Sequence, residues 1–132
     1  MRNQHILVVD DESHIRMSLF ILLRDAGYRV TTAQDGWGVV NRLSSSEMSP
    51  EPIDLILTDV RMPELGGVEL IDELRRRQLT VPIMIITAYK SDHLMSELSK
   101  RGRYELIEKP YDSLELVERI EAFFRNRNIP EA

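Results

Sequence analysis

The stretch Ile53-Asp54-Leu55-Ile56-Leu57-Thr58, followed directly by Asp59, decides the fold of this chain. A short and almost continuously apolar run of this kind is typical of a parallel strand buried on both faces. Asp59 closes that strand with a carboxylate, which needs a partner because an unpaired buried charge is costly. The stretch therefore predicts a central strand with a polar site at its carboxyl end.

Similar apolar runs occur on both sides of this stretch, and segments with helical spacing separate them. The predicted strands are residues 6–9, 29–33, 53–58, 81–87 and 105–108. Short strands that alternate with helices predict a parallel sheet covered by helices on both faces. Right-handed crossovers leave few topologies, and the flavodoxin-like order 2-1-3-4-5 suits a chain of this length. The expected fold is an α/β, three-layer (βα)5 sandwich.

Apolar residues at helical spacing predict helices between several of these strands. The residues that define one helical face are Ile15, Leu19, Leu22 and Ala26 in the first helix, Val68, Ile71 and Leu74 in the third, and Leu116, Ile120 and Phe123 in the last. Gly27 can end the first helix, and Asp112 with Glu115 can cap the last. The second helix, residues 37–43, contains Gly38, which costs about 1 kcal/mol relative to Ala. Residues 44–50 are typical of an exposed loop.

The length, charge and cysteine count limit the classes of protein. The chain has 132 residues and fits one domain. We expect this domain to be residues 1–126, with residues 127–132 as a C-terminal tail or the start of a linker to an output domain. The net charge of −5 works against direct nucleic-acid binding. The basic runs Arg75-Arg76-Arg77 and Lys100-Arg101 are expected on solvated helix faces. The absence of cysteine excludes disulfides and thiolate metal sites.

No apolar run is long enough to cross a bilayer, and the N-terminal run meets Asp10 too early for a signal-peptide core. We therefore expect a cytoplasmic protein without a membrane partner.

Residues that can do chemistry follow four of the five predicted strands. They are Asp10 and Asp11 after the first strand, Asp59 after the third, Thr87 at the end of the fourth and Lys109 after the fifth. These four strands are consecutive neighbours in the order 2-1-3-4-5, so the residues that close them can converge. The remaining strand ends in Ala33-Gln34, which has no comparable group. The contrast favours a single assembled site.

A divalent cation is expected at this site. Three carboxylates within about 4 Å of one another would repel by roughly 4 kcal/mol per pair at an effective dielectric constant of 20. Hard cations with oxygen ligands offset such repulsion, and Mg²⁺ typically uses one or two carboxylates with waters and phosphate oxygens. Mg²⁺ or Mn²⁺ is therefore the predicted cofactor.

The same residues can support phosphoryl transfer to a carboxylate. Asp59 can act as a nucleophile when a metal and a cation neutralise the charge that develops on the transferred group. Lys109 supplies a mobile positive charge for a phosphoryl oxygen, and Thr87 supplies a hydroxyl donor. The predicted chemistry is phosphorylation of Asp59.

Five ordered motifs resemble the response regulator receiver family of two-component signalling. They are Val8-Val9-Asp10-Asp11-Glu12, Asp59-Val60-Arg61-Met62-Pro63, Gly67-Val68-Glu69-Leu70, Thr87-Ala88 and Lys109-Pro110. The match runs through nearly the whole chain, and several motifs in order are far more specific than any one of them. The resemblance implies a CheY-like phospho-acceptor domain that is a signalling switch rather than an enzyme.

The resemblance also implies a role for each site residue. Asp59 would take a phosphoryl group from a sensor histidine kinase or a phosphotransfer protein. Asp11 and Asp59 would bind the cation directly, Asp10 largely through water, and Arg61 through its backbone carbonyl. Thr87 and Lys109 would bind the phosphoryl group and move on activation, and the Lys109-Pro110 bond would be cis. The switch region would comprise Thr87, Leu106 and Pro110.

Some residues depart from the family pattern. Leu106 stands where many receivers have Tyr or Phe as a rotameric switch, and Tyr104 is not the positional equivalent. Arg103 replaces a small residue and is expected to make the fifth strand more exposed or more charged. Arg61 and Tyr89 are expected to be exposed near the pocket, where their bulk would hinder an attacking water and lengthen the phosphoryl lifetime.

Simpler roles are open to individual residues. Asp10-Asp11 could cap the first helix, Thr87 could be a strand-end hydroxyl, and Lys109 could be a surface lysine. His5, His14 and His93 lack ligand spacing, so surface or partner roles are expected for them. Residues expected to pack in the core are Met17, Met84 and Met95, with Trp37 in the core or on a helix face.

Three other functions remain open. A metal-dependent phosphatase with an Asp nucleophile would place Asp-x-Asp on the first strand and carry a cap domain, whereas this chain has Asp10-Asp11-Glu12. A flavodoxin-like FMN binder needs a phosphate loop rich in Ser, Thr and Gly, and the acidic residues here would repel the phosphate. The third is a receiver-like module that is never phosphorylated. Turnover of phosphomonoesters would support the first, and a coloured purified protein the second.

Overall fold

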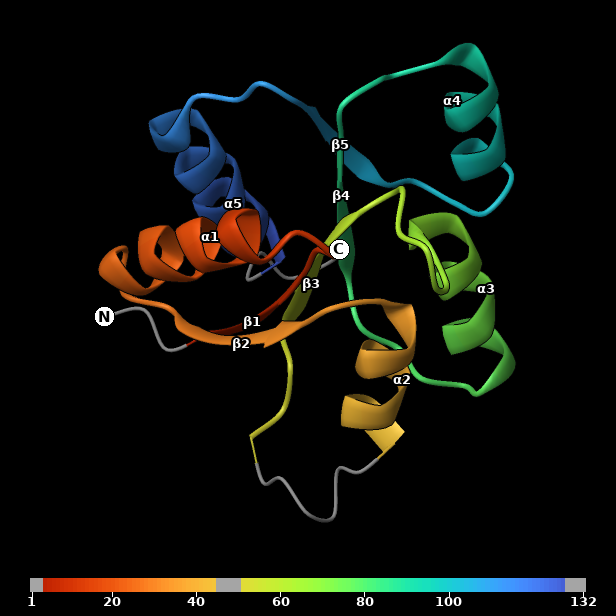
Figure 1. Cartoon of the computed structure of the whole chain (residues 1–132), viewed down its shortest axis with the longest axis horizontal. Helices are drawn as coiled ribbons and strands as arrows, with labels where there is room; N and C mark the ends of the chain where they lie inside the picture. Colours follow the sequence, from red (N-terminus) through yellow and green to blue (C-terminus); the bar gives the residue numbers. More distant parts are fainter. Residues whose placement is uncertain (1–3, 45–50, 128–132) are drawn as a thin grey trace.

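A five-stranded parallel sheet forms the centre of the molecule (Figure 1). The computed structural model describes residues 4–44 and 51–127. The strands are β1 His5–Val9, β2 Arg29–Ala33, β3 Leu55–Asp59, β4 Ile83–Thr87 and β5 Glu105–Glu108. Their order is β2-β1-β3-β4-β5, which confirms the predicted flavodoxin-like topology.

Helices cover both faces of the sheet and make three layers. They are α1 Ser13–Asp25, α2 Gly36–Ser44, α3 Gly67–Arg76, α4 Asp92–Ser99 and α5 Ser113–Arg127. Leu23 of α1 and Ile120 of α5 belong to one core cluster, whereas Val40 of α2 and Leu74 of α3 belong to another. Leu94 of α4 packs with α3 in a third cluster. The three-layer prediction is confirmed.

The central strands are apolar except at their ends because both of their faces are buried. Leu55 and Leu57 of β3 belong to the cluster under α1 and α5, while Ile56 belongs to the cluster under α2 and α3. Successive side chains of a strand point to opposite faces. The apolar run Leu55–Leu57 therefore contributes to the core on both faces of the sheet.

The predicted helix ends agree with the structure. Gly27 has a φ of 101°, a conformation that favours glycine, and its N–H donates to the carbonyl of Arg24 at 3.0 Å. Asp112 Oδ1 accepts a hydrogen bond from the N–H of Leu114 at 2.8 Å and lies 3.4 Å from that of Glu115. The apolar spacing did not predict α4, which buries Leu94 and Leu98 and is capped by Ser91.

The predicted strands 29–33 and 105–108 have the observed bounds, the other three differ by one or two residues at their start, and β3 also ends one residue later than predicted. The loop prediction for residues 44–50 falls mostly on residues 45–50, which lie outside the described residues; residue 44 ends α2. The domain boundary at residue 126 stays a prediction. None of the described helices has the length and apolar character needed to cross a membrane.

Some predictions about single side chains are wrong. Met84 is buried as expected, but Met17 is 57% exposed on α1 and Met95 is 37% exposed on α4. Trp37 is 41% exposed on α2, so of its two expected positions it has the one on a helix face and not the one in the core. Apolar type alone does not tell which face of a helix a residue occupies, and exposed apolar residues are common.

His5 is buried, which contradicts the expectation of a surface role. It begins β1, is 2% exposed, and its Nε2 lies 2.6 Å from Thr31 Oγ1 on β2. Its backbone N–H donates to Asp54 Oδ2 at 2.8 Å. The polar side chain is tolerated inside because a neighbouring strand gives it a hydrogen-bond partner. His14 and His93 are exposed, as expected.

Candidate functional site

The carboxyl ends of four neighbouring strands bring the predicted site residues to one edge of the sheet. The parallel register sets Val9 opposite Thr58, Asp59 opposite Ile86 and Thr87 opposite Glu108. Asp10 follows β1 directly, Asp59 ends β3, and Lys109 follows β5. The residues therefore converge because these strands end at similar heights in adjacent positions.

Lys109 joins two of the carboxylates. Its Nζ lies 2.8 Å from Asp59 Oδ2 and 3.7 Å from Asp10 Oδ2. Its backbone N–H donates to the Thr87 carbonyl at 2.7 Å, and the Lys109-Pro110 bond is cis, as the resemblance predicts. The simpler role of a surface lysine is wrong, because Lys109 is an ion-pair partner with 20% of its side chain exposed.

Asp10 is the buried carboxylate of the site, with 2% of the residue exposed. Burial raises the pKa of Asp10 above its usual value; the N–H of Glu12 and the charge of Lys109 oppose this, and Asp59 and Asp11 add to it. Its Oδ1 accepts that N–H at 2.9 Å. A buried carboxylate among like charges is costly, so a nearby cation stabilises it.

The positive charge of Lys109 is maintained by its partners. Burial works to lower the pKa of Lys109, but the hydrogen bond from Nζ to Asp59 and the charges of Asp59 and Asp10 outweigh this and raise it. The ammonium group is thus the charge that balances the carboxylates in this structure.

Asp59 is held at both oxygens. While Oδ2 contacts Lys109, Oδ1 accepts the backbone N–H of Arg61 at 3.1 Å. The chain after Arg61 then turns back on itself: Gly67 donates its N–H to the carbonyl of Val60 at 3.0 Å, and a Cβ on Gly66 would lie 2.5 Å from that carbonyl oxygen. Residue 66 must therefore be glycine for the loop to take this path.

Asp11 lies on the exposed side of the site. It lines a hollow with Arg61, Pro63 and Glu69, beside the start of α3. In residues 4–44 and 51–127, no three His, Asp or Glu side chains gather closely enough to be a metal-binding group. Lys109 contacts both Asp10 and Asp59, whereas Asp11 is exposed to solvent beside them.

The donor atoms still suit a hard cation. Asp10 and Asp59 carry carboxylate oxygens on adjacent strands, and Asp11 faces the adjoining hollow. Mg²⁺ needs one or two carboxylates, with waters at its other positions. Three carboxylates with one ammonium beside them leave a net negative charge, so these oxygen donors fit Mg²⁺ or Mn²⁺.

Thr87 is at the predicted place, but its hydroxyl is engaged elsewhere. The residue is 3% exposed, and its Oγ1 lies 3.1 Å from the carbonyl of Tyr89 and 3.2 Å from the N–H of Tyr89. These contacts fix the loop after β4 rather than reaching Asp59. A phosphoryl-binding role for Thr87 requires this hydroxyl to turn.

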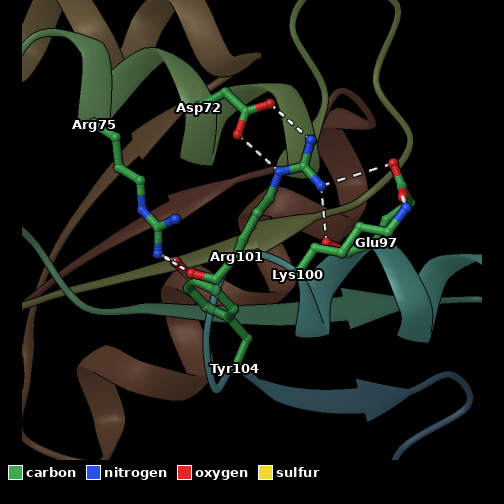
Figure 2. A network of polar contacts seen from close by, with 6 residues as sticks. All are labelled: Asp72, Arg75, Glu97, Lys100, Arg101 and Tyr104. Carbon is green, nitrogen blue, oxygen red and sulfur yellow. Dashed lines mark hydrogen bonds and ion pairs between the residues drawn. The ribbon is translucent and has the colours of Figure 1, made fainter.

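Leu106 and Tyr104 lie on the same side of β5, against the cluster that α3 and α4 form. Leu106 is half-buried, and Tyr104 Oη lies 3.0 Å from Arg75 Nη2 of α3 (Figure 2). Arg103, which precedes β5, is exposed as expected, and so are Glu105 and Glu108 of the strand. Arg61 and Tyr89 are exposed as expected.

The family model described as the response regulator receiver domain matches residues 6–121. This chain belongs to that family. The receiver domain is 34% identical over 121 residues to the transcriptional regulatory protein FixJ of Bradyrhizobium diazoefficiens, and 32% identical over 116 residues to the response regulator SaeR of Staphylococcus aureus. These matches cover 92% and 88% of this chain but 57% and 48% of those proteins, so the receiver spans about half of their length.

Solved structures have the same fold as the receiver. The chemotaxis protein CheY4 of Vibrio cholerae aligns with a TM-score of 0.77 at 29% identity, over 90% of this chain and 97% of that one. FixJ-N aligns with a TM-score of 0.80 at 26% identity, over the whole of both chains. These alignments confirm the predicted flavodoxin-like α/β fold.

The sequence pattern did not predict that Arg16 lies near the site. Arg16 of α1 donates from Nη1 to the backbone carbonyl of Asp10 at 2.7 Å and so holds the turn after β1. Nothing in the apolar spacing of α1 marks residue 16. Capping of α1 by Asp10 or Asp11 is wrong, because Glu12 is its N-cap residue.

Proposed function

We propose that Asp59 accepts a phosphoryl group and that this receiver thereby switches a partner or an attached output domain. The observation that supports the proposal is the position of Lys109, with its Nζ 2.8 Å from Asp59 Oδ2 and 3.7 Å from Asp10 Oδ2. A lysine so placed can move from a carboxylate oxygen to a phosphoryl oxygen without leaving the site.

The proposed reaction is a displacement at phosphorus. A carboxylate oxygen of Asp59 forms a bond to phosphorus while the bond from phosphorus to the donor's imidazole nitrogen breaks, and the imidazole leaves with the electron pair. The ammonium of Lys109 then balances charge on the transferred group. The receiver speeds its own phosphorylation and a slow hydrolysis, and does not turn over an external substrate.

Asp11 and Asp59 would hold Mg²⁺ directly, Asp10 through water, and Arg61 through its backbone carbonyl. When bound, the cation neutralises charge that develops on the phosphoryl oxygens. The ammonium of Lys109 lies close enough to Asp10 to stabilise the ionised carboxylate, and this is the form that would bind a water of the cation.

The switch would use Thr87, Leu106 and Pro110. Turning the Thr87 hydroxyl toward a phosphoryl group would break its contacts with Tyr89 and release the loop before α4. Leu106, without an aromatic ring, would respond by a smaller packing change. The exposed Arg61 and Tyr89 would hinder an attacking water and lengthen the phosphoryl lifetime.

The proposed partners are a sensor histidine kinase or a phosphotransfer protein in the cytoplasm. FixJ and SaeR are both longer than this chain. We therefore propose an output domain beyond residue 132, joined through residues 127–132, with no direct nucleic-acid contact by the receiver.

The test is incubation with Mg²⁺ and acetyl phosphate or beryllofluoride, followed by mass and NMR measurements. A mass increase of one phosphoryl group and shifts around Asp59, Thr87 and Lys109 are expected, and Asp59→Asn should abolish the mass increase. A natural protein that stays unmodified in the presence of Mg²⁺ would show the proposal to be wrong.

A further inference from the structure

A hollow of about 620 Å³ lies at the opposite edge of the sheet, away from Asp59. It is bounded by the amino ends of β4 and β5, by Arg75 of α3 and by Phe123 of α5. Its size is within the range of small-molecule sites. Nothing in the phosphorylation chemistry uses it.

The hollow lies beside the segment that leads into β4. The register sets Met84 opposite Glu105, so Ile83, the first residue of β4, and residues 80–82 before it have no partner on β5. The chain enters β5 through Gly102, whose φ of 143° favours glycine. This turn leaves a space beside residues 80–83.

Two arginines give the hollow a positive charge. Arg75 donates to the carbonyl of Arg101 and to Tyr104 Oη, which are both neutral acceptors (Figure 2). Arg103 is exposed at the rim. Within the described residues, neither guanidinium has a carboxylate at ion-pair distance. Glu105 also lines the hollow, but its charge is paired with Arg119 at 3.1 Å.

The rest of the lining is largely apolar. Val81, Ile83 and Phe123 each lie partly buried around the hollow, and Ile83 and Phe123 pack against two different core clusters. An apolar wall beside two guanidinium groups that have no carboxylate partner among the described residues fits a ligand with an apolar body and an acidic head group.

We propose that this hollow binds a small amphipathic carboxylate, with its acid group at Arg75 and Arg103 and its apolar body against Val81 and Phe123. The ligand would contact both β4 and β5, which lead to Thr87 and Lys109 at the other edge. The inference does not depend on phosphorylation of Asp59.

The test is a titration of the ¹⁵N-labelled protein with 4-phenylbutyrate. Saturable NMR shifts are expected at residues 80–84 and 102–105, and 4-phenylbutanol, which has no charge, should bind much more weakly. Arg103→Gln should weaken binding about fivefold, as for one partly exposed ion pair. Arg125→Gln, which changes an exposed arginine of α5 outside the hollow, should leave binding unchanged.

Shifts that are absent from both segments would overturn the proposal. Equal affinity for 4-phenylbutanol, or for the Arg103→Gln protein, would also overturn it, because the guanidinium groups would then not recognise the acid. Arg103 is exposed, so its replacement should leave the fold intact, and the unperturbed part of the NMR spectrum verifies this.

Discussion

At the scale of single residues, Lys109 contacts two of the carboxylates that are expected to hold a cation. Its Nζ lies 2.8 Å from Asp59 Oδ2 and 3.7 Å from Asp10 Oδ2, so its positive charge repels a metal ion that binds to the same carboxylates. Lys109→Met should therefore raise Mg²⁺ affinity about tenfold, since a unit charge is removed at contact distance. Calorimetric titration measures this.

A matched control is Lys100→Met, which removes a lysine that pairs with Glu97 on α4. Its Mg²⁺ affinity should equal that of the natural protein. Unchanged or weaker Mg²⁺ binding by the Lys109→Met protein would mean that the cation does not bind between these carboxylates.

Asp10 is expected to cost stability when no metal is bound. Its raised pKa means that folding disfavours the charged form, so this residue's contribution to stability falls as pH rises through the raised pKa. Asp10→Asn should raise the free energy of unfolding by about 1 kcal/mol at pH 7 without Mg²⁺. Urea unfolding measures this, with the exposed Asp11→Asn as the control. A gain that is equal at both positions would count against burial as the cause.

At the scale of elements, Arg101 ties the end of α4 to α3 (Figure 2). Its Nε and Nη2 donate to the two oxygens of Asp72 at 2.7 and 2.8 Å, and its Nη1 donates to the Glu97 carbonyl at 2.8 Å. Lys100 is exposed as expected, whereas Arg101 is half-buried between the two helices, which corrects the expectation of a solvated position for it. By contrast, Arg76 and Arg77 pair with Glu73 on α3, at the helix surface.

Arg101→Ala should lower the free energy of unfolding by only about 1 kcal/mol, because a partly exposed bidentate ion pair contributes little. It should also speed amide exchange in α4, because a short helix depends strongly on each contact that holds it. Arg76→Ala removes an ion pair within α3 and should leave α4 exchange unchanged. Hydrogen exchange measured by mass spectrometry separates the two. Equal exchange in both variants would show that Arg101 does not hold α4.

The sequence predicts the order of the strands better than it predicts the bounds of the elements or the direction of side chains. Ile53 is buried and so looks like part of a strand, yet β3 begins at Leu55. The helix α4 was missed because two leucines are its whole buried face. The predicted strand ends gave the correct positions of Asp59, Thr87 and Lys109 in the fold. The direction of each side chain, however, depends on the geometry of the loops. That is why the turn of Thr87 toward Tyr89 and the outward position of Asp11 were not predicted.

At the scale of the whole molecule, His5 makes stability depend on pH. Burial, followed by the charge of Arg29, lowers the pKa of His5 below 6.5, while Glu51 opposes this. The unfolded chain therefore binds the proton more readily, and the contribution of His5 to stability falls as pH decreases from its ordinary pKa toward the lowered one.

His5→Gln should flatten this part of the stability profile, because an amide does not titrate there. Thermal unfolding between pH 5 and pH 7 measures the slope, and His14→Gln, at an exposed position of α1, is the control. The same slope in the His5→Gln protein would assign the pH dependence to other groups.

The place of β5 at the border of the sheet also bears on self-association. A border strand presents unpaired backbone groups that a second molecule could extend, and charged side chains discourage this. Glu105 and Glu108 stand at the two ends of this four-residue strand, and both are exposed. Because Glu105 is paired with Arg119, the charge that opposes the pairing of two β5 strands comes mainly from Glu108.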